Sequence, residues 1–281
     1  LYVAVTNPAP DLPAHLRPGL NLYTNSVVAL DIRSGELRWY DQVVPNDFHD
    51  WDLTQVSPLF KTTIEGRERD LLATVGKDGF LRVLDRESHE RLYETPISRQ
   101  LNADVPLTKE GVRVCPGVNG GVLWHGPAYN PGTNQLYIGA IDWCTTFALT
   151  DSVRFVPGQL YMGGTLRPDP ENEGRVTAVD ASTGEVRWMY RSELPVLGAV
   201  TTTAGNLLFL GELTGDLVAF NAETGDELFR SRTSGPIGGG VVTYTVDGKQ
   251  YVAVSSGRPS GLNWRAGPSG APNVMIFALP G

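Results

Sequence analysis

One pattern recurs four times in the 281 residues and constrains the fold more than any other feature. An apolar alternating strand is followed by Asp or Asn, a short turn, and a second strand that ends in an aromatic residue. Such a repeat is the signature of stacked β units, each too small to bury its apolar face alone. The four copies cover residues 27–40, 81–94, 176–189 and 217–230.

The turn of each copy contains a position where the backbone needs positive φ. Gly35, Gly184 and Gly225 fill it in three copies, and glycine adopts positive φ without steric cost. The second copy has His89 at this position. We therefore expect that its turn is strained or belongs to another type.

Other strand-like segments are 4–7 residues long with period-2 alternation, and no segment sustains a period of 3.6 residues. This excludes a mostly helical or an alternating α/β protein. A repeat of roughly 40 residues predicts an all-β fold, a β-propeller of four-stranded blades. A β-sandwich is the alternative, but it does not need the repeated frame. We expect one propeller domain over 1–281, with an irregular insertion at 145–173 and about five blades: 1–44, 56–97, 122–192, 198–233 and 236–280.

Charge and hydropathy narrow the possible partners. The formal charge is −8 and no Lys/Arg run occurs, which argues against a nucleic-acid surface. No apolar stretch approaches the roughly 20 residues that span a bilayer. The sequence opens with a strand-like segment and has neither an initiating Met nor a charged leader, so we expect that it begins inside a fold.

The segment PNDFHDWDLTQ (45–55) crowds acidic residues among aromatic ones. In an extended chain Asp50 and Asp52 point to the same side. Their charges repel unless a cation or a shared proton lies between them. The alternative is a solvated turn in which the Asp side chains cap backbone N–H groups.

The repeated Ala-x-Asp-x-x-(Thr/Ser)-Gly-Glu-x-x-Trp frame resembles the tryptophan-docking motif of the pyrroloquinoline quinone (PQQ) dehydrogenases. In that family the aromatic residue of one blade stacks on peptide planes of the next. The resemblance covers nearly the whole chain, which matches the C-terminal part of an eight-bladed ring of about twice this length. Further matching stretches are 3–31, 76–86, 126–144 and 201–257.

The resemblance implies PQQ-dependent oxidation of an alcohol or an aldose. The other half of such a ring normally supplies a Glu metal ligand, a Trp beneath the quinone, a vicinal Cys-Cys ring and most groups that hold the PQQ carboxylates. None of these has a candidate in this sequence, so the chain alone could be inactive. The alternative function is a propeller that serves as a binding or scaffold module.

The stretch NDFHDWD (46–52) resembles the family segment that carries the catalytic base. The resemblance implies that Asp50 takes the hydroxyl proton of the substrate. It implies that Asp52 is an additional metal ligand, as in lanthanide-dependent relatives, because a trivalent ion favours more anionic oxygens. A turn cap remains the alternative for Asp52. Asn46 and His49 replace a usual His and a usual Trp, which makes the wall beside the base more polar.

Four further residues receive roles from the resemblance. Asn7 is implied as a metal ligand, with a strand-end turn before Pro8 as the alternative. Lys77 is implied as the cation that binds the quinone oxygen and the base, with an exposed turn lysine as the alternative. Trp124 and Leu197 fall at positions that line the cofactor pocket, although many relatives have Trp where Leu197 stands.

The resemblance also implies the cofactors, partners and compartment. The cofactors are PQQ and either Ca²⁺ or a lanthanide ion. The partners are an alcohol, an electron acceptor such as cytochrome c, and either a second copy or a chain that supplies missing blades. Relatives have a disulfide at the spacing of Cys115 and Cys144, and a disulfide fits a periplasmic or secreted protein. Two buried free thiols are the alternative.

Overall fold

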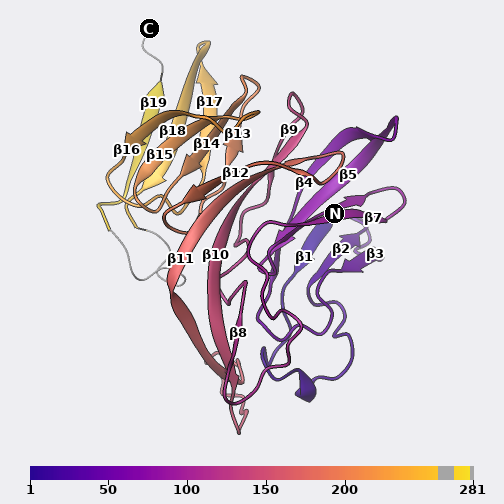
Figure 1. The fold of residues 1–281 in the computed structure, drawn as a ribbon. Helices are drawn as coiled ribbons and strands as arrows, with labels where there is room; N and C mark the ends of the chain where they lie inside the picture. The colour runs from indigo at the N-terminus through magenta and orange to yellow at the C-terminus, as the bar shows by residue number, and fades with distance from the viewer. Residues whose placement is uncertain (259–268, 279–281) are drawn as a thin grey trace. The chain divides into compact units, whose positions relative to one another are not determined.

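A computed structural model describes residues 1–258 and 269–278 (Figure 1). Within these ranges the chain forms 19 strands, and the one helical element is the 3-10 turn η1 (Ala14–Leu16). The strands make five antiparallel sheets. This confirms the prediction of an all-β fold with about five blade-like sheets.

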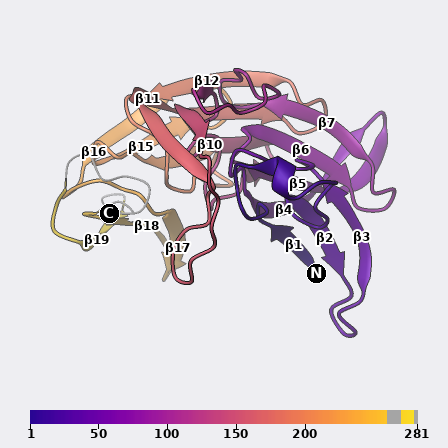
Figure 2. The same cartoon turned by 90° about the horizontal axis from the view of Figure 1, so that it is seen from below.

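The first two sheets are consecutive in sequence, and their strands can be followed in Figure 2. The first contains β1 (Tyr2–Val5), β2 (Ser26–Leu30) and β3 (Leu37–Gln42). The second contains β4 (Leu53–Ile64), β5 (Arg67–Gly76), β6 (Phe80–Asp85) and β7 (Arg91–Pro96).

The third sheet contains the longest strands, and its order is β12-β11-β10-β8 with β9 paired to β10. Its strands are β8 (Val112–Val114), β9 (Ala128–Asn130), β10 (Gln135–Leu149), β11 (Gly164–Asp180) and β12 (Val186–Ser192). We expected an irregular insertion over 145–173. Here β10 and β11 extend into that region from both sides, and 150–163 contains no strand.

The last two sheets complete the described chain. The fourth contains β13 (Thr201–Thr202), β14 (Leu207–Gly211), β15 (Asp216–Asn221) and β16 (Glu227–Arg232). The fifth contains β17 (Val241–Val246), β18 (Lys249–Ser256) and β19 (Asn273–Ala278). No helix in the described ranges is long and apolar enough to cross a membrane.

The chain divides into two compact units, which we describe separately. The first comprises Leu1–Leu59, Asp70–Gly126 and Asp142–Asn172. The second comprises Phe60–Arg69, Pro127–Ile141 and Glu173–Gly281. The expectation of a single propeller domain stays a prediction.

All four repeat turns have the same backbone geometry. Gly35, Gly184 and Gly225 have φ of 74°, 79° and 78°, and His89 has φ of 65°. In each, the amide donates to the carbonyl of the Asp or Asn four residues earlier, at 2.9 Å. His89 therefore adopts the glycine conformation although it has a Cβ, which is the strain that the sequence predicted.

The docking aromatics are present in both units. In the first, the Trp39 ring stacks on His89 with centroids 4.7 Å apart. In the second, Trp188 lies against Gly225, where an added Cβ would approach its ring to 2.7 Å. The Trp188 Nε1 also donates to the Ala222 carbonyl at 3.0 Å. Within each unit an aromatic residue of one sheet thus contacts the repeat turn of another.

The fourth sheet is buried on both faces, since alternate residues of a strand point to opposite sides. One face packs in a cluster with Trp188 and Tyr190 of β12. The other face packs in a cluster with residues of the fifth sheet. The first face carries Leu208, Leu210, Val218 and Phe220, and the second carries Phe209, Leu217 and Ala219.

The fifth sheet leaves an apolar face exposed. Val242, Val274 and Ile276 are exposed by 62%, 68% and 59%. The register pairs Val242 with Ala253 and Ala253 with Ile276, so these side chains share a face. Contiguous apolar surface of this kind is typical of contact regions. Self-association remains a prediction.

Candidate active site

Lys77 lies between the two carboxylates that the sequence singled out. It follows β5, and its side chain reaches the loop before β4 within the first unit. The Lys77 Nζ lies 3.0 Å from the Asp50 carbonyl oxygen, 2.9 Å from Asp50 Oδ2 and 2.7 Å from Asp52 Oδ2. Lys77 is 8% exposed. The cation expected between Asp50 and Asp52 is therefore supplied by the protein itself.

The carboxylates come together through an unusual backbone and not through an extended segment. Asp50 has φ of 62°, in the left-handed region. Asp52 binds Lys77 twice, because its carbonyl accepts the Lys77 backbone N–H at 3.0 Å. Asp52 thus acts as an ion-pair partner of Lys77.

Asn7 lies beside Asp52. It follows β1, and its backbone N–H donates to Asp52 Oδ1 at 3.2 Å. Its side-chain Nδ2 donates to the Pro8 carbonyl at 3.2 Å. The structure therefore brings together Asn7, Asp50, Asp52 and Lys77, four residues that the sequence assigned to one site.

Two residues that the sequence did not single out complete the charge distribution. Arg17 donates to the carbonyls of Asp11 and Asp47. Burial raises the pKa of Asp11 to about 7, helped by the nearby charges of Asp50, Asp47 and Asp52. No spacing in the sequence indicated Arg17, because its bond to Asp47 joins loops 30 residues apart. Nothing in the sequence marked Asp11 either.

Burial and pairing oppose each other at the central ion pairs. Burial raises the pKa of Asp50, and Lys77 lowers it less. Burial by itself lowers the pKa of Lys77, but Asp50 and Asp52 outweigh it, so that pKa is raised. Four carboxylates at 11, 47, 50 and 52 face two cations. If all four were ionised, the site would carry excess negative charge. The raised pKa of Asp11, about 7, means that a proton relieves part of this charge near neutral pH, and a further cation would compete with that proton.

The residues present fit a hard metal ion. The carboxamide of Asn7 and the carboxylates of Asp50 and Asp52 are oxygen donors, which Ca²⁺ and trivalent lanthanides prefer. In the described part of the chain no group of three or more His, Cys, Asp or Glu side chains is arranged to hold a metal. A site here therefore rests on two carboxylates and one amide.

His49, the polar residue beside Asp50, is buried and neutral. His49 is 1% exposed and stacks on Trp51 with centroids 4.2 Å apart. Its ring also contacts Phe48 and Phe147. Burial lowers the His49 pKa to about 3, so the ring carries no charge at neutral pH. The wall is more polar in composition without adding a cation.

The two residues assigned to the cofactor pocket lie in different units. Trp124, in the first unit, is 40% exposed and has φ of 48°. Its carbonyl accepts a bond from Gln55 Nε2 at 2.7 Å. Leu197, in the second unit, is 3% exposed in the loop after β12. Their cofactor roles stay predictions.

The implied disulfide is confirmed. Cys115 and Cys144 are bonded with their Cα atoms 4.4 Å apart. The bond joins the residue after β8 to β10, inside the first unit. The free-thiol alternative is therefore wrong.

A cavity of about 270 Å³ adjoins the acidic loop. Asn46 and Phe48 line it together with mostly apolar residues, namely Leu12, Ala14, Pro106, Leu107 and Leu149, and with His15 and Asp104. Asp50 is not among its lining residues. The cavity therefore belongs to the flank of the site and not to its chemistry.

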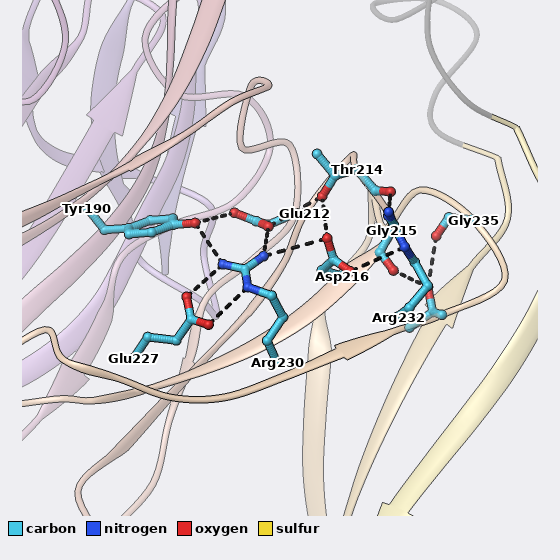
Figure 3. Close-up of polar contacts among 10 residues, drawn as sticks. Tyr190, Glu212, Thr214, Gly215, Asp216, Glu227, Arg230, Arg232 and Gly235 are labelled. Carbon is cyan, nitrogen blue, oxygen red and sulfur yellow. Dashed lines mark hydrogen bonds and ion pairs between the residues drawn. The ribbon is translucent and has the colours of Figure 1, made fainter.

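The second unit contains a separate network around Glu212, in the turn between β14 and β15 (Figure 3). Glu212 is 3% exposed. Tyr190 Oη donates to its Oε1 at 2.7 Å, and Arg230 Nη1 donates to its Oε2 at 2.6 Å. Arg230 also pairs with Glu227 at 2.7 Å. We call these four residues the Glu212 network.

Two parts of the chain match two different protein-family models. Residues 1–101 match the model described as "Glucose/ethanol/alcohol dehydrogenase, beta-propeller domain". Residues 172–267 match the model described as "Outer membrane protein assembly factor BamB". Both are consistent with the blade-like repeats.

Two curated relatives cover most of the chain. Quinoprotein alcohol dehydrogenase PedH of Pseudomonas putida is 32% identical over 89% of this chain and 46% of its own length. The lanthanide-dependent methanol dehydrogenase of Methylorubrum extorquens is 29% identical over 100% of this chain and 52% of its own. The chain thus spans about half the length of the curated relatives it matches.

Solved structures agree with this relationship. The quinohemoprotein alcohol dehydrogenase ADHIIG of Pseudomonas putida HK5 matches with a TM-score of 0.89 and 26% identity. The match covers 99% of this chain and 46% of that one. A europium-containing methanol dehydrogenase matches with a TM-score of 0.83 and 26% identity, over 91% of this chain and 48% of that one.

Proposed function

Because the chain is related to the quinoprotein alcohol dehydrogenases along most of its length, we propose that it contributes to the PQQ-dependent oxidation of an alcohol or an aldose. The observation that carries the proposal is the buried Lys77 between Asp50 and Asp52. A scaffold has no need for this arrangement, whereas a proton acceptor beside a hydride transfer does.

Asp50 and Lys77 are the proposed catalytic residues. Asp50 accepts the hydroxyl proton of the substrate, and burial keeps its basicity above that of a solvated Asp. Lys77 holds the Asp50 carboxylate in place and stabilises negative charge that develops beside it. PQQ would supply the hydride acceptor, and a metal ion held by Asn7, Asp50 and Asp52 would supply a Lewis acid.

Asn7, Asp50 and Asp52 are the proposed metal ligands. Asp52 adds a second carboxylate, so we propose a preference for a trivalent lanthanide over Ca²⁺. The excess of carboxylates over cations in the first unit supports this assignment. Relatives named as lanthanide-dependent or europium-containing are consistent with it.

Lys77, Trp124 and Leu197 are the proposed contacts of PQQ. An ammonium group has three donors, and in this structure all three find acceptors on Asp50 and Asp52. A bond from Lys77 to a quinone oxygen would therefore have to replace one of these contacts. Trp124 offers an exposed ring, and Leu197 an apolar side chain.

We propose a periplasmic or secreted location and a cytochrome c electron acceptor. The disulfide supports the first assignment. The second rests on a relative whose name, lupanine 17-hydroxylase [cytochrome c], includes cytochrome c. Association with a second copy, or with a chain that supplies further blades, belongs to the same proposal.

A binding or scaffold module is the second candidate function. The match of residues 172–267 to an outer-membrane assembly factor favours it for that part of the chain. The two candidate functions make different predictions for the first unit. A scaffold would not need Lys77 to retain a quinone, whereas the proposed oxidation would.

The test is retention of the quinone. The full chain is incubated with PQQ and either La³⁺ or Ca²⁺, passed through gel filtration and examined by absorbance. We expect the quinone to elute with the wild type and with Lys61→Met, an exposed control lysine that pairs with Glu68, but not with Lys77→Met. Equal elution with both variants, or none with the wild type, favours the scaffold.

A further inference from the structure

Asp50 has a backbone conformation that needs support. Its φ of 62° lies in the left-handed region, which costs a non-glycine residue free energy and persists only where the surroundings hold it. Asp tolerates this region better than most residues. The direction of the Asp50 carboxylate therefore depends on what holds the backbone on either side of it.

The Asp47 carboxylate binds the backbone on both sides of Asp50. Its Oδ1 accepts the His49 N–H at 2.9 Å, and its Oδ2 accepts the Trp51 N–H at 2.8 Å. His49 and Trp51 are the two neighbours of Asp50. Asp47 is 1% exposed, so water does not compete for these bonds.

The carbonyl groups of the same segment are also engaged. The Trp51 carbonyl accepts a bond from Asn25 Nδ2, and the Asp50 carbonyl accepts one from Lys77 Nζ. Arg17 donates to the carbonyl of Asp47 and to Asn46 Oδ1. The loop is thus fixed from both sides, and Asp47 supplies the bonds that span Asp50.

Other turns of the same chain show why this residue needs two equivalent oxygens. Three Asp residues accept two successive amides on one oxygen, Oδ1, and Asn221 does the same with its amide oxygen. An Asn therefore suffices in those turns. The three Asp residues are Asp31, Asp85 and Asp180.

Asp47 differs because it divides the two amides between its two oxygens. An Asn in its place presents an NH₂ group to one of the two N–H donors, so one bond is lost and a donor faces a donor. A carboxylate is required at this position, whereas an amide serves at the four repeat turns.

We propose that Asp47 is the positioning residue of the site: its carboxylate clamps the amides on both sides of Asp50 and thereby aims Asp50 at Lys77 and at a bound cation. This rests on the proposed function, because it assigns Asp47 the task of orienting the proposed base. Removal of a residue that hydrogen-bonds and orients a metal ligand typically lowers metal affinity or activity by about 10–100-fold.

The test compares Asp47→Asn with Asp31→Asn in the full chain. Both replace a buried or partly buried carboxylate that accepts two amides, but only the first divides them between two oxygens. La³⁺ alone is titrated by calorimetry, and exchange of the His49 and Trp51 amides is followed by hydrogen–deuterium exchange. We expect about 10–100-fold weaker La³⁺ binding in Asp47→Asn, faster exchange of both amides, and wild-type behaviour in Asp31→Asn.

Unchanged La³⁺ affinity in a folded Asp47→Asn variant overturns the proposal. If the wild type binds no La³⁺, the metal part of the proposed function fails, and the clamp is judged by exchange and by acetylation of Lys77. Faster exchange and new Lys77 labelling in Asp47→Asn support the clamp, and unchanged values reject it. If Asp47→Asn does not fold, Asp47→Glu replaces it, because Glu keeps two equivalent oxygens but displaces them from the His49 and Trp51 amides by one methylene. La³⁺ affinity that stays unchanged while both amides exchange faster then overturns the proposal.

Discussion

Two turns at the same place in their sheets carry opposite charges. Lys77 follows β5 directly after Gly76, and Glu212 follows β14 directly after Gly211. Both residues are buried, at 8% and 3% exposure. Lys77 forms ion pairs with two carboxylates of a loop, whereas Glu212 accepts hydrogen bonds from Arg230 and Tyr190, which lie on strands.

The two turns differ in the charge that is left once their ion pairs have formed. The Glu212 network satisfies its buried carboxylate with a cation and a hydroxyl, both on regular strands. The Lys77 site leaves excess negative charge and depends on a loop with a left-handed Asp50. Such loops on a rigid scaffold commonly carry function. The same turn position thus supports structure in one unit and a poised site in the other.

The largest expected effect comes from removing the cation of the first unit. Lys77→Met leaves Asp50 and Asp52, whose side chains are 17% and 19% exposed, without their cation, and loss of one partner of a buried pair costs about 3–5 kcal/mol. Chemical denaturation measures the free energy of unfolding. We expect added La³⁺ to stabilise this variant more than the wild type, since a metal ion replaces the missing charge. A loss below about 1 kcal/mol would show that the pairs do not hold the site.

The next largest effect is expected from reduction of the disulfide, which should affect the first unit before the second. The Cys115–Cys144 bond joins two residues 29 positions apart in the sequence, and the chain-entropy model values such a loop closure at roughly 3–4 kcal/mol. Both cysteines lie in the first unit. Hydrogen–deuterium exchange after reduction should accelerate in peptides of β8 and β10 before those of the Glu212 network. Uniform acceleration in both units contradicts this.

A smaller loss is expected when the corresponding cation of the second unit is removed. Arg230→Met leaves Glu212 without its ion-pair partner, but the Arg230 side chain is 35% exposed. Solvent screens such a pair, so we expect about 1–2 kcal/mol. La³⁺ should not restore stability here. Restoration by La³⁺ would mean that the two turns do not differ in metal binding.

The smallest effect is a pH dependence of the second unit. Burial, with help from Glu212, raises the Tyr190 pKa to about 12 in the folded state. Because the folded pKa lies above the ordinary value of about 10, the stabilisation is complete below pH 10 and is lost as pH rises through 12. Denaturation at pH 9, 11 and 12 tests this against Tyr190→Phe, which should show a weaker decline over that range.

The sequence predicted the parts of this molecule that repeat locally. The Asp-turn-aromatic frame predicted the paired strands and a turn at His89 that is strained or of another type, and His89 takes the strained option with positive φ. The resemblance implied docking of the frame's aromatic residue on peptide planes, whereas Trp39 stacks on the ring of His89. The extension of β10 and β11 was not foreseen. These two strands are consecutive and neighbours in one sheet, but the 14 residues between them, 150–163, contain no short turn signal that would mark where each strand ends.

The same distinction applies to the candidate site. Asp50, Asp52 and Lys77 were found from the acidic cluster and the resemblance. Arg17 was missed because its contacts reach residues about 30 positions away. Asp47 offered a usable signal, because an Asp side chain in a turn commonly accepts the backbone N–H of the residue two positions later, here His49. Its division of two amides between two oxygens is visible only in three dimensions.

The most direct measurement of the central claim is calorimetric binding of La³⁺ and Ca²⁺ to the wild type, Asp52→Ala and Glu212→Ala. We predict tighter La³⁺ than Ca²⁺ binding in the wild type. Asp52→Ala should lose at least about 10-fold in La³⁺ affinity and less for Ca²⁺, and Glu212→Ala should bind like the wild type. Equal affinity for both ions, or no loss in Asp52→Ala, would contradict the claim that the Lys77 turn is built around a cation site.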